Sequence, residues 1–164
     1  MFNREIISLA EQVVAECRRR KVMVCTVESC TGGLVAGALS EVAGASHALE
    51  RGFVTYTNGA KSELVGVPPD LIHHHGAVSE AVARAMAEGG LSHSAAAVAV
   101  AVTGIAGPDG GSATKPVGLV HFATAVRDGA VRHSQQIFAG DRTAVRQASV
   151  AMALGLLLAA LRGD

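Results

Sequence analysis

The sequence predicts a layered α/β/α sandwich with a mixed, mostly parallel sheet that ends in an antiparallel hairpin. Short β-branched runs alternate with longer stretches of helical periodicity, as in βαβ units. The run from Ala95 to Val102 is apolar at every position, as expected of a central strand that is covered on both faces. Asp128-Gly129 separates two strand-like segments near the end of the chain, which is typical of a tight hairpin turn.

The first third of the chain predicts a helix, a strand, a second helix and a second strand. Apolar residues from Ile6 to Cys17 recur at near-helical spacing, and the cations of Arg18 to Lys21 suit a helix C-terminus. A strand over Val22 to Val27 is expected next, followed by a tight turn and a small-residue helix over Leu34 to Val42. Arg51 to Thr57 alternates well enough to predict the second strand.

The middle of the chain predicts helices and then a long loop. Pro68-Pro69 divides two short helical pieces, and Ser79 suits the N-cap of a helix that runs to about Leu91. Gly104 to Gly118 contains too many glycines and prolines for a regular element. Long loops without regular structure in small domains usually have a function, so we expect this one to contribute to a site.

The last part of the chain predicts the hairpin and a closing helix. The hairpin strands are expected over Leu119 to Arg127 and Ala130 to Phe138, and Asp141 is expected to cap a helix that runs to about Leu161. The apolar stretch from Val150 is shorter than the roughly 20 residues that span a bilayer. It therefore predicts a buried helix or an oligomer interface.

Composition restricts the classes of function. The 164 residues suit one domain, and 14 Lys+Arg balance 14 Asp+Glu, so the charge expected of a general nucleic-acid or anionic-membrane binder is missing. Any anion must then be held locally. Cys17, Cys25 and Cys30 are an odd number of cysteines with no apolar secretory segment before them, which predicts a reduced, cytoplasmic protein.

Ser29 is a candidate nucleophile. It follows a predicted strand and precedes Gly32-Gly33 and a helix, so its hydroxyl would lie at a sharp turn beside backbone N–H groups that can stabilise an oxyanion. The competing interpretation is an N-cap serine in an ordinary loop between strand and helix. Glu28 and Thr31 have the same alternative, as turn and cap residues.

Lys61 is a candidate base, near Tyr56 and Asn58 where the second strand ends and the next helix begins. Burial in a cleft with little counter-charge lowers the pKa of a lysine, and a neutral amine can take the proton of a serine hydroxyl. The alternative is a solvated lysine on the first turn of a helix.

The glycine-rich loop and the last helix supply candidate anion-binding groups. Thr103 ends the central strand, and Gly104, Gly107, Gly110 and Gly111 allow backbone amides to approach a phosphate or carboxylate closely. Arg142 offers a bidentate fork to an anion, or else forms only a surface pair with Asp141. Consecutive histidines on a helix cannot all face one ion, so His73-His74-His75 does not predict a metal site, and no metal or cofactor is expected.

Six motifs in matching order resemble the C-terminal domain of the competence/damage-inducible protein CinA over nearly the whole chain. They are Glu28-Ser29-Cys30-Thr31-Gly32-Gly33, Val54-Thr55-Tyr56-Thr57-Asn58 with Lys61, Gly66-Val67-Pro68, His75-Gly76-Ala77-Val78-Ser79, Val102-Thr103-Gly104-Ile105-Ala106-Gly107-Pro108 with Lys115-Pro116-Val117-Gly118, and Gly140-Asp141-Arg142. The resemblance implies one such domain over residues 1–164, without the N-terminal molybdopterin-binding-like domain of larger relatives.

The resemblance also implies an activity and a set of site residues. Family members that act as enzymes hydrolyse the carboxamide of nicotinamide mononucleotide (NMN) to nicotinic acid mononucleotide and ammonia, without a cofactor. Two groups of residues are implied: catalytic Ser29, Lys61, Tyr56 and Thr103, and substrate-binding Thr31, Gly32, Gly33, Asn58, Gly104, Gly107 and Arg142.

Three hypotheses therefore stand on the sequence: an NMN amidohydrolase, a non-catalytic nucleotide-binding module of a competence or damage response, and a Ser-Lys amidase for another small amide. The expected partner is a small molecule rather than a nucleic acid or a membrane. The apolar last helix makes a homo-oligomer reasonable.

Overall fold

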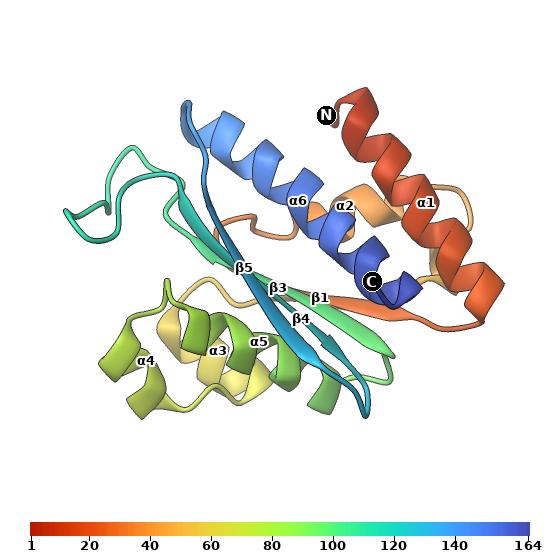
Figure 1. Ribbon diagram of the computed structural model, residues 1–164, viewed down its shortest axis with the longest axis horizontal. Coiled ribbons are helices and arrows are strands. Elements are labelled where there is room, and N and C mark those ends of the chain that lie inside the picture. Colours follow the sequence, from red (N-terminus) through yellow and green to blue (C-terminus); the bar gives the residue numbers. More distant parts are fainter.

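A five-stranded mixed sheet separates two layers of helices in the computed structural model, which describes residues 1–164 (Figure 1). The strand order across the sheet is β2 (Leu49–Val54), β1 (Val24–Glu28), β3 (Val98–Gly104), β4 (Leu119–Val126) and β5 (Val131–Ile137). One face carries α1 (Arg4–Arg20), α2 (Leu34–Ser40) and α6 (Arg142–Arg162). The other carries α3 (Asn58–Val65), α4 (Pro69–His75) and α5 (Glu80–Ser92). The predicted α/β/α sandwich is confirmed.

The sheet changes from parallel to antiparallel in the middle. β1 pairs in parallel with β2 and β3, whereas β3 pairs with β4 and β4 with β5 in antiparallel fashion. A parallel connection needs a crossover, usually a helix, and the loop between Gly104 and Leu119 contains none. The antiparallel part therefore begins one strand before the predicted hairpin, which itself turns at Asp128 with a left-handed φ of 56°.

Most predicted helix ends are confirmed by their caps. The side chains of Ser79 and Asp141 accept hydrogen bonds from the first turns of α5 and α6, and α1 ends on Lys21 in the left-handed conformation. The second strand begins and ends earlier than the predicted Arg51 to Thr57. Thr57 does not extend the strand, because its side chain accepts the N–H of Ala60 at 3.1 Å and caps α3.

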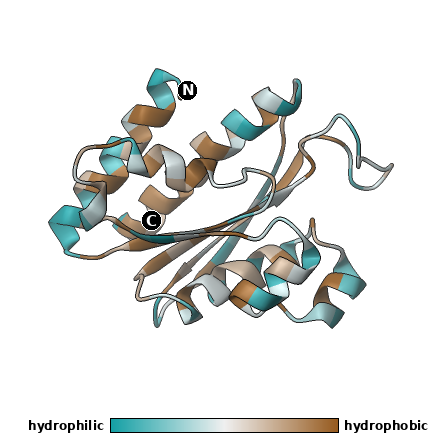
Figure 2. Ribbon diagram, turned by 180° about the vertical axis from the view of Figure 1, so that it is seen from behind, coloured by the Kyte–Doolittle hydropathy of each residue, from teal (hydrophilic) through white to brown (hydrophobic).

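Two apolar clusters fill the spaces between the layers, and Figure 2 shows apolar residues where the helices meet the sheet. The cluster beside α5 is built on small strand residues, among them Ala99, Ala101, Ala123 and Ala125. Helix α5 meets its neighbours through Gly89 and Gly90: a Cβ on Gly89 would lie 1.9 Å from the carbonyl oxygen of Val65. Small residues thus allow these backbones to pack closely.

Helix α6 is the one helix whose length and composition would suit a membrane span. In the fold it instead lies against the sheet and α1, with a buried side that includes Val150, Leu154, Leu157 and Leu161. The predicted buried helix is confirmed, and it starts well before the apolar stretch.

Two glycine-to-alanine substitutions in helices should have opposite effects on stability. Gly89→Ala places a Cβ against the backbone of Val65, so we expect the free energy of unfolding to fall by about 1–3 kcal/mol. Gly155→Ala meets nothing within 4 Å and should raise it by up to roughly 1 kcal/mol through helix propensity. Urea denaturation measures both values. Equal shifts in the two variants would contradict the close packing of α5 on α3.

Candidate active site

The site lies at the carboxyl ends of β1, β2 and β3, where the chain continues from β1 to α2 on one face of the sheet and from β2 to α3 on the other. Open α/β sheets bind ligands at such a switch point. Ser29 directly follows β1, and its N–H donates to the carbonyl of Val102 on β3 at 2.9 Å. On the other side, the N–H of Thr55 donates to the carbonyl of Glu28 at 2.8 Å. The turn after β1 is therefore held by the ends of both neighbouring strands.

Glu28 caps the helix that follows the turn. Its fully buried carboxylate accepts the N–H groups of Gly33, Val35 and Ala36 at 2.9–3.0 Å, and its negative charge faces the positive end of the α2 dipole. Gly33 holds the N-cap position with a φ of 96° and no side chain. Ser29 is thus not a cap residue, and its hydroxyl is available for another partner.

That partner is Lys61 on α3. Its Nζ lies 3.1 Å from Ser29 Oγ, 2.9 Å from the carbonyl oxygen of Thr55 and 3.5 Å from that of Tyr56. The side chain is 1% exposed and forms no ion pair, so the alternative of a solvated lysine is wrong. Burial lowers the pKa of Lys61 from its usual 10.5.

The surroundings of the amine direct its lone pair. A neutral lysine has two N–H groups and one lone pair, and the two backbone carbonyls can only accept hydrogen bonds. When the amine is neutral and donates both N–H groups to Thr55 and Tyr56, its lone pair faces Ser29 Oγ. This arrangement suits Lys61 to remove the hydroxyl proton.

Two amides of the turn form no hydrogen bond to another residue. The N–H of Gly32 donates to the carbonyl of Ser29 at 3.0 Å, and that of Gly33 donates to Glu28. The N–H groups of Cys30 and Thr31 have no acceptor in the protein. Gly32 and Gly33, predicted to bind substrate, have their amides engaged inside the turn, and supply its left-handed backbone with φ values of 59° and 96°.

Arg142 connects the end of β2 to the glycine-rich loop. Its guanidinium donates to the Tyr56 hydroxyl and to the carbonyl of Gly107, both at 2.8 Å. Asp141 does not pair with it, since the Asp141 carboxylate accepts the N–H of Ala144. The alternative of a mere surface pair is therefore wrong. Tyr56 is about half exposed, so its side chain is accessible from solvent.

The remaining predicted residues lie around this centre. The buried Thr103 hydroxyl donates to the carbonyl of Ala77 at 2.9 Å, which joins the segment before α5 to the end of β3. Asn58 is exposed at the start of α3, with no hydrogen bond from its side chain. Gly104 packs tightly, because a Cβ there would lie 2.7 Å from Val120. The predicted residues thus share one edge of the sheet, with Ser29 and Lys61 in direct contact.

Sequence reasoning indicated backbone N–H groups beside Ser29 but missed the backbone carbonyls that hold Lys61. The carbonyl of Thr55, which accepts from Lys61, carries no signal in side-chain chemistry. The Cys30 thiol is buried, and burial raises its pKa to about 11, so it stays protonated beside the nucleophile. His73, His74 and His75 are exposed at the end of α4, and no group of three or more metal-binding side chains is gathered anywhere.

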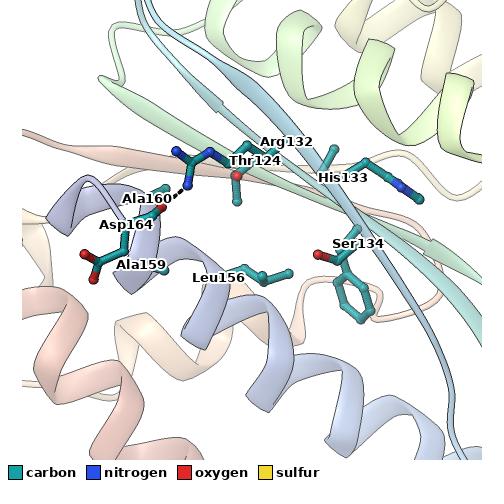
Figure 3. A pocket seen from close by; sticks show the side chains of 10 residues that line it. Thr124, Arg132, His133, Ser134, Leu156, Ala159, Ala160 and Asp164 are labelled. Carbon is teal, nitrogen blue, oxygen red and sulfur yellow. Dashed lines mark hydrogen bonds between the residues drawn. The ribbon is translucent and has the colours of Figure 1, made fainter.

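A pocket of about 230 Å³ toward the other end of the sheet has a different character. It lies between β4, β5 and the end of α6, where the Arg132 guanidinium donates to the backbone carbonyl of Asp164 (Figure 3). Ser134 lines it without a lysine or other base bonded to its hydroxyl. The parts of an acyl-transfer site are found only at the Ser29 edge.

The fold and this edge define an α/β protein in which a half-buried serine contacts a buried lysine beside unpaired backbone amides. The chain belongs to the CinA C-terminal domain family, whose model matches residues 6–161. It is 48% identical over 157 residues to nicotinamide-nucleotide amidohydrolase PncC of Escherichia coli K12, covering 96% of this chain and 95% of that protein. The protein of the same name from Enterobacter agglomerans is 50% identical over 151 residues, 92% of each chain.

Solved structures agree with the fold. The crystal structure of competence/damage inducible protein CihA from Agrobacterium tumefaciens superposes with a TM-score of 0.96 at 50% identity, covering 99% of this chain and 98% of that one. A CinA superfamily protein from Klebsiella pneumoniae gives a TM-score of 0.92 at 34% identity, covering 97% and 99%.

Burial of Lys61 should make stability depend on pH in a defined direction. The folded state lowers the pKa of Lys61, so between that value and the usual 10.5 the unfolded chain binds more protons. The free energy of unfolding of the wild type, relative to Lys61→Met, should therefore rise with pH through this window and fall as pH drops through it. Denaturant unfolding of both proteins at several pH values checks this. A constant difference would mean that the amine does not lose its proton more readily when folded.

Proposed function

We propose that the protein hydrolyses the carboxamide of NMN to nicotinic acid mononucleotide and ammonia, in the recycling of pyridine nucleotides, with Ser29 as nucleophile and Lys61 as its base. The observation that carries the proposal is the 3.1 Å contact between Ser29 Oγ and the buried Nζ of Lys61, which forms no ion pair. The choice of NMN as the substrate rests on relatives that are named for this activity and match nearly the whole chain at 48–50% identity.

Acylation begins when Lys61 takes the Ser29 proton and Oγ attacks the carboxamide carbon. The carbonyl oxygen becomes an oxyanion, and the free N–H groups of Cys30 and Thr31 are the donors for it. When the tetrahedral intermediate collapses, the C–N bond breaks and Lys61 returns the proton to the leaving nitrogen. Ammonia departs and a nicotinoyl ester remains on Ser29.

Deacylation repeats these roles with water. Lys61 takes a proton from water, the hydroxide attacks the ester carbon, and the same amides hold the second oxyanion. The bond to Ser29 Oγ then breaks, and the proton on Lys61 restores the hydroxyl. Ser29 is only half-buried, so part of the residue is in contact with solvent.

The phosphate of the substrate would be held by the glycine-rich loop. The N–H groups of Gly107, Gly110 and Gly111 have no acceptor in the protein. Arg142, which already contacts Gly107 and Tyr56, keeps further guanidinium N–H groups for an anion. A chain of zero net charge can thus bind an anionic mononucleotide through a few placed groups.

Ammonia release from NMN tests the reaction and the nucleophile together. Ser29→Ala should lower kcat by at least about a thousandfold, because the attacking oxygen is removed. Ser40→Ala is the matched control, since the Ser40 hydroxyl bonds only to the carbonyl of Gly37 at the end of α2, and it should leave kcat unchanged. NMN binding by calorimetry without ammonia would favour a non-catalytic nucleotide-binding module. Ammonia from other amides alone would favour a different amidase.

The pH dependence tests the base. The kcat/KM for NMN should rise with pH up to the pKa of Lys61 in the free enzyme, which burial places below 10.5. Lys61→Arg should be inactive at every pH, because a guanidinium stays protonated. The measurement is initial rate at low substrate from about pH 6 to about pH 10. A flat profile, or an active arginine variant, would leave Ser29 without the proposed base.

A further inference from the structure

Arg146 lies on the far side of the nucleophile turn. We propose that it is a positioning residue for the reaction proposed above, on which this inference rests. Its guanidinium fixes the peptide groups after Ser29, so that the N–H of Thr31 stays directed away from α6 and available to the oxyanion. Arg146 does not touch the substrate in this role. It acts through the backbone of Cys30 and Thr31.

Two hydrogen bonds carry the inference. Arg146 Nε donates to the carbonyl of Cys30 at 3.1 Å, and Nη2 donates to that of Thr31 at 3.2 Å. In a trans peptide the C=O and the following N–H point in opposite directions. Drawing both carbonyls toward α6 therefore turns the N–H groups of Thr31 and Gly32 away from it. The N–H of Gly32 indeed donates to Ser29 on the inner side of the turn, whereas that of Thr31 is left free.

The Cys30–Thr31 peptide depends on this tether more than the rest of the turn. The N–H groups of Gly32, Gly33 and Leu34 donate to Ser29, Glu28 and Thr31, whereas the carbonyl of Cys30 has no partner other than Arg146. If the Cys30–Thr31 peptide flipped, the carbonyl of Cys30 would replace the Thr31 N–H on the inner side and repel an oxyanion. Hydrogen bonds from a charged donor are roughly twice as strong as neutral ones, so Arg146 opposes this flip.

The Arg146 side chain forms hydrogen bonds only to the nucleophile turn. Its only hydrogen-bond partners are the two carbonyls, and it forms no ion pair with a carboxylate. It follows Arg142 by four residues on α6, so the two side chains share one side of the helix. Arg142 reaches the loop and Arg146 the nucleophile turn. One helix thus positions both.

A pocket beside Arg146 makes chemical rescue feasible. The pocket is about 200 Å³, and Arg146 lines it together with Phe2, Leu34, Thr143 and Gln147. Truncating Arg146 would widen this space, and a free guanidinium ion in the buffer has the same donors as the lost group. Restored activity would show that the hydrogen bonds, rather than the fold, were lost.

The experiment compares Arg146→Met and Arg146→Lys with Gln147→Ala, which changes the neighbouring residue in the same pocket. We expect Arg146→Met to lower kcat for NMN by about ten- to a hundredfold with KM nearly unchanged, since an oxyanion donor is worth about a hundredfold or more. Arg146→Lys should lie between, because an ammonium cannot bridge two carbonyls in the same fork geometry. Guanidinium should restore rate to Arg146→Met but not to Ser29→Ala. Gln147→Ala should match the wild type.

A second readout separates this inference from the choice of substrate. With p-nitrophenyl acetate, Ser29 Oγ attacks the acetyl carbon, Lys61 takes the hydroxyl proton and p-nitrophenolate leaves, so the release of p-nitrophenolate reports the turn without NMN. Mass spectrometry locates the acetyl group. If acetylation of Ser29 is slower in Arg146→Met while the wild type releases no ammonia from NMN, the role of Arg146 is supported and NMN is excluded as the substrate. The role of Arg146 would be overturned if a folded Arg146→Met variant had the kcat and the acetylation rate of the wild type. A change in KM alone would also overturn it.

Discussion

The bond between the Glu28 carboxylate and the first amides of α2 is the interaction on which the site depends. The carboxylate takes three N–H groups and the favourable end of the helix dipole. Because Glu28 at the end of β1 caps α2, the side chains of the five residues between β1 and α2 are not needed as caps. Ser29 can then bond to Lys61, and two amides of the turn can remain unpaired. A serine cap would instead have consumed the nucleophile.

The many small residues of the chain allow the close packing that places Lys61 beside Ser29. Alanines on β3 and β4, with Gly89 and Gly90 on α5, bring the helices of one layer close to the sheet and to one another. Helix α3 is thereby held where Lys61 reaches the end of β1 while almost fully buried. The amine meets backbone carbonyls rather than a carboxylate, so its charge is not stabilised by a partner and its pKa falls. The close packing that buries Lys61 therefore also lowers the pKa of its amine.

Much of the fold could be predicted from local signals. Ser79, Asp141 and Asp128-Gly129 act through their own side chains and φ preferences, and each is where the sequence places it. The start of the antiparallel part depended on which strands become neighbours, which is set by tertiary contacts. The end of β2 depended on the local cap that Thr57 gives to α3. At the site, the residue types were predictable, and the Ser29–Lys61 contact was implied only by family resemblance. The carbonyls that hold Lys61 were not predictable, since a carbonyl has the same chemistry in every residue, and the burial of Lys61 was only one of two interpretations of the sequence.

The unpaired groups of the turn argue for function rather than stability. A folded chain gains by pairing its polar groups, yet here the N–H groups of Cys30 and Thr31 lack acceptors, and the buried Thr31 hydroxyl also lacks a partner. Close by, a lysine is buried without a counter-ion. Each feature costs folding free energy, and nothing in the rest of the fold requires them together. A bound group with a developing negative oxygen next to Ser29 would accept hydrogen bonds from these amides. In the same step Lys61 would take the proton of the Ser29 hydroxyl. The cost is then recovered in the transition state, which is how preorganised sites accelerate acyl transfer.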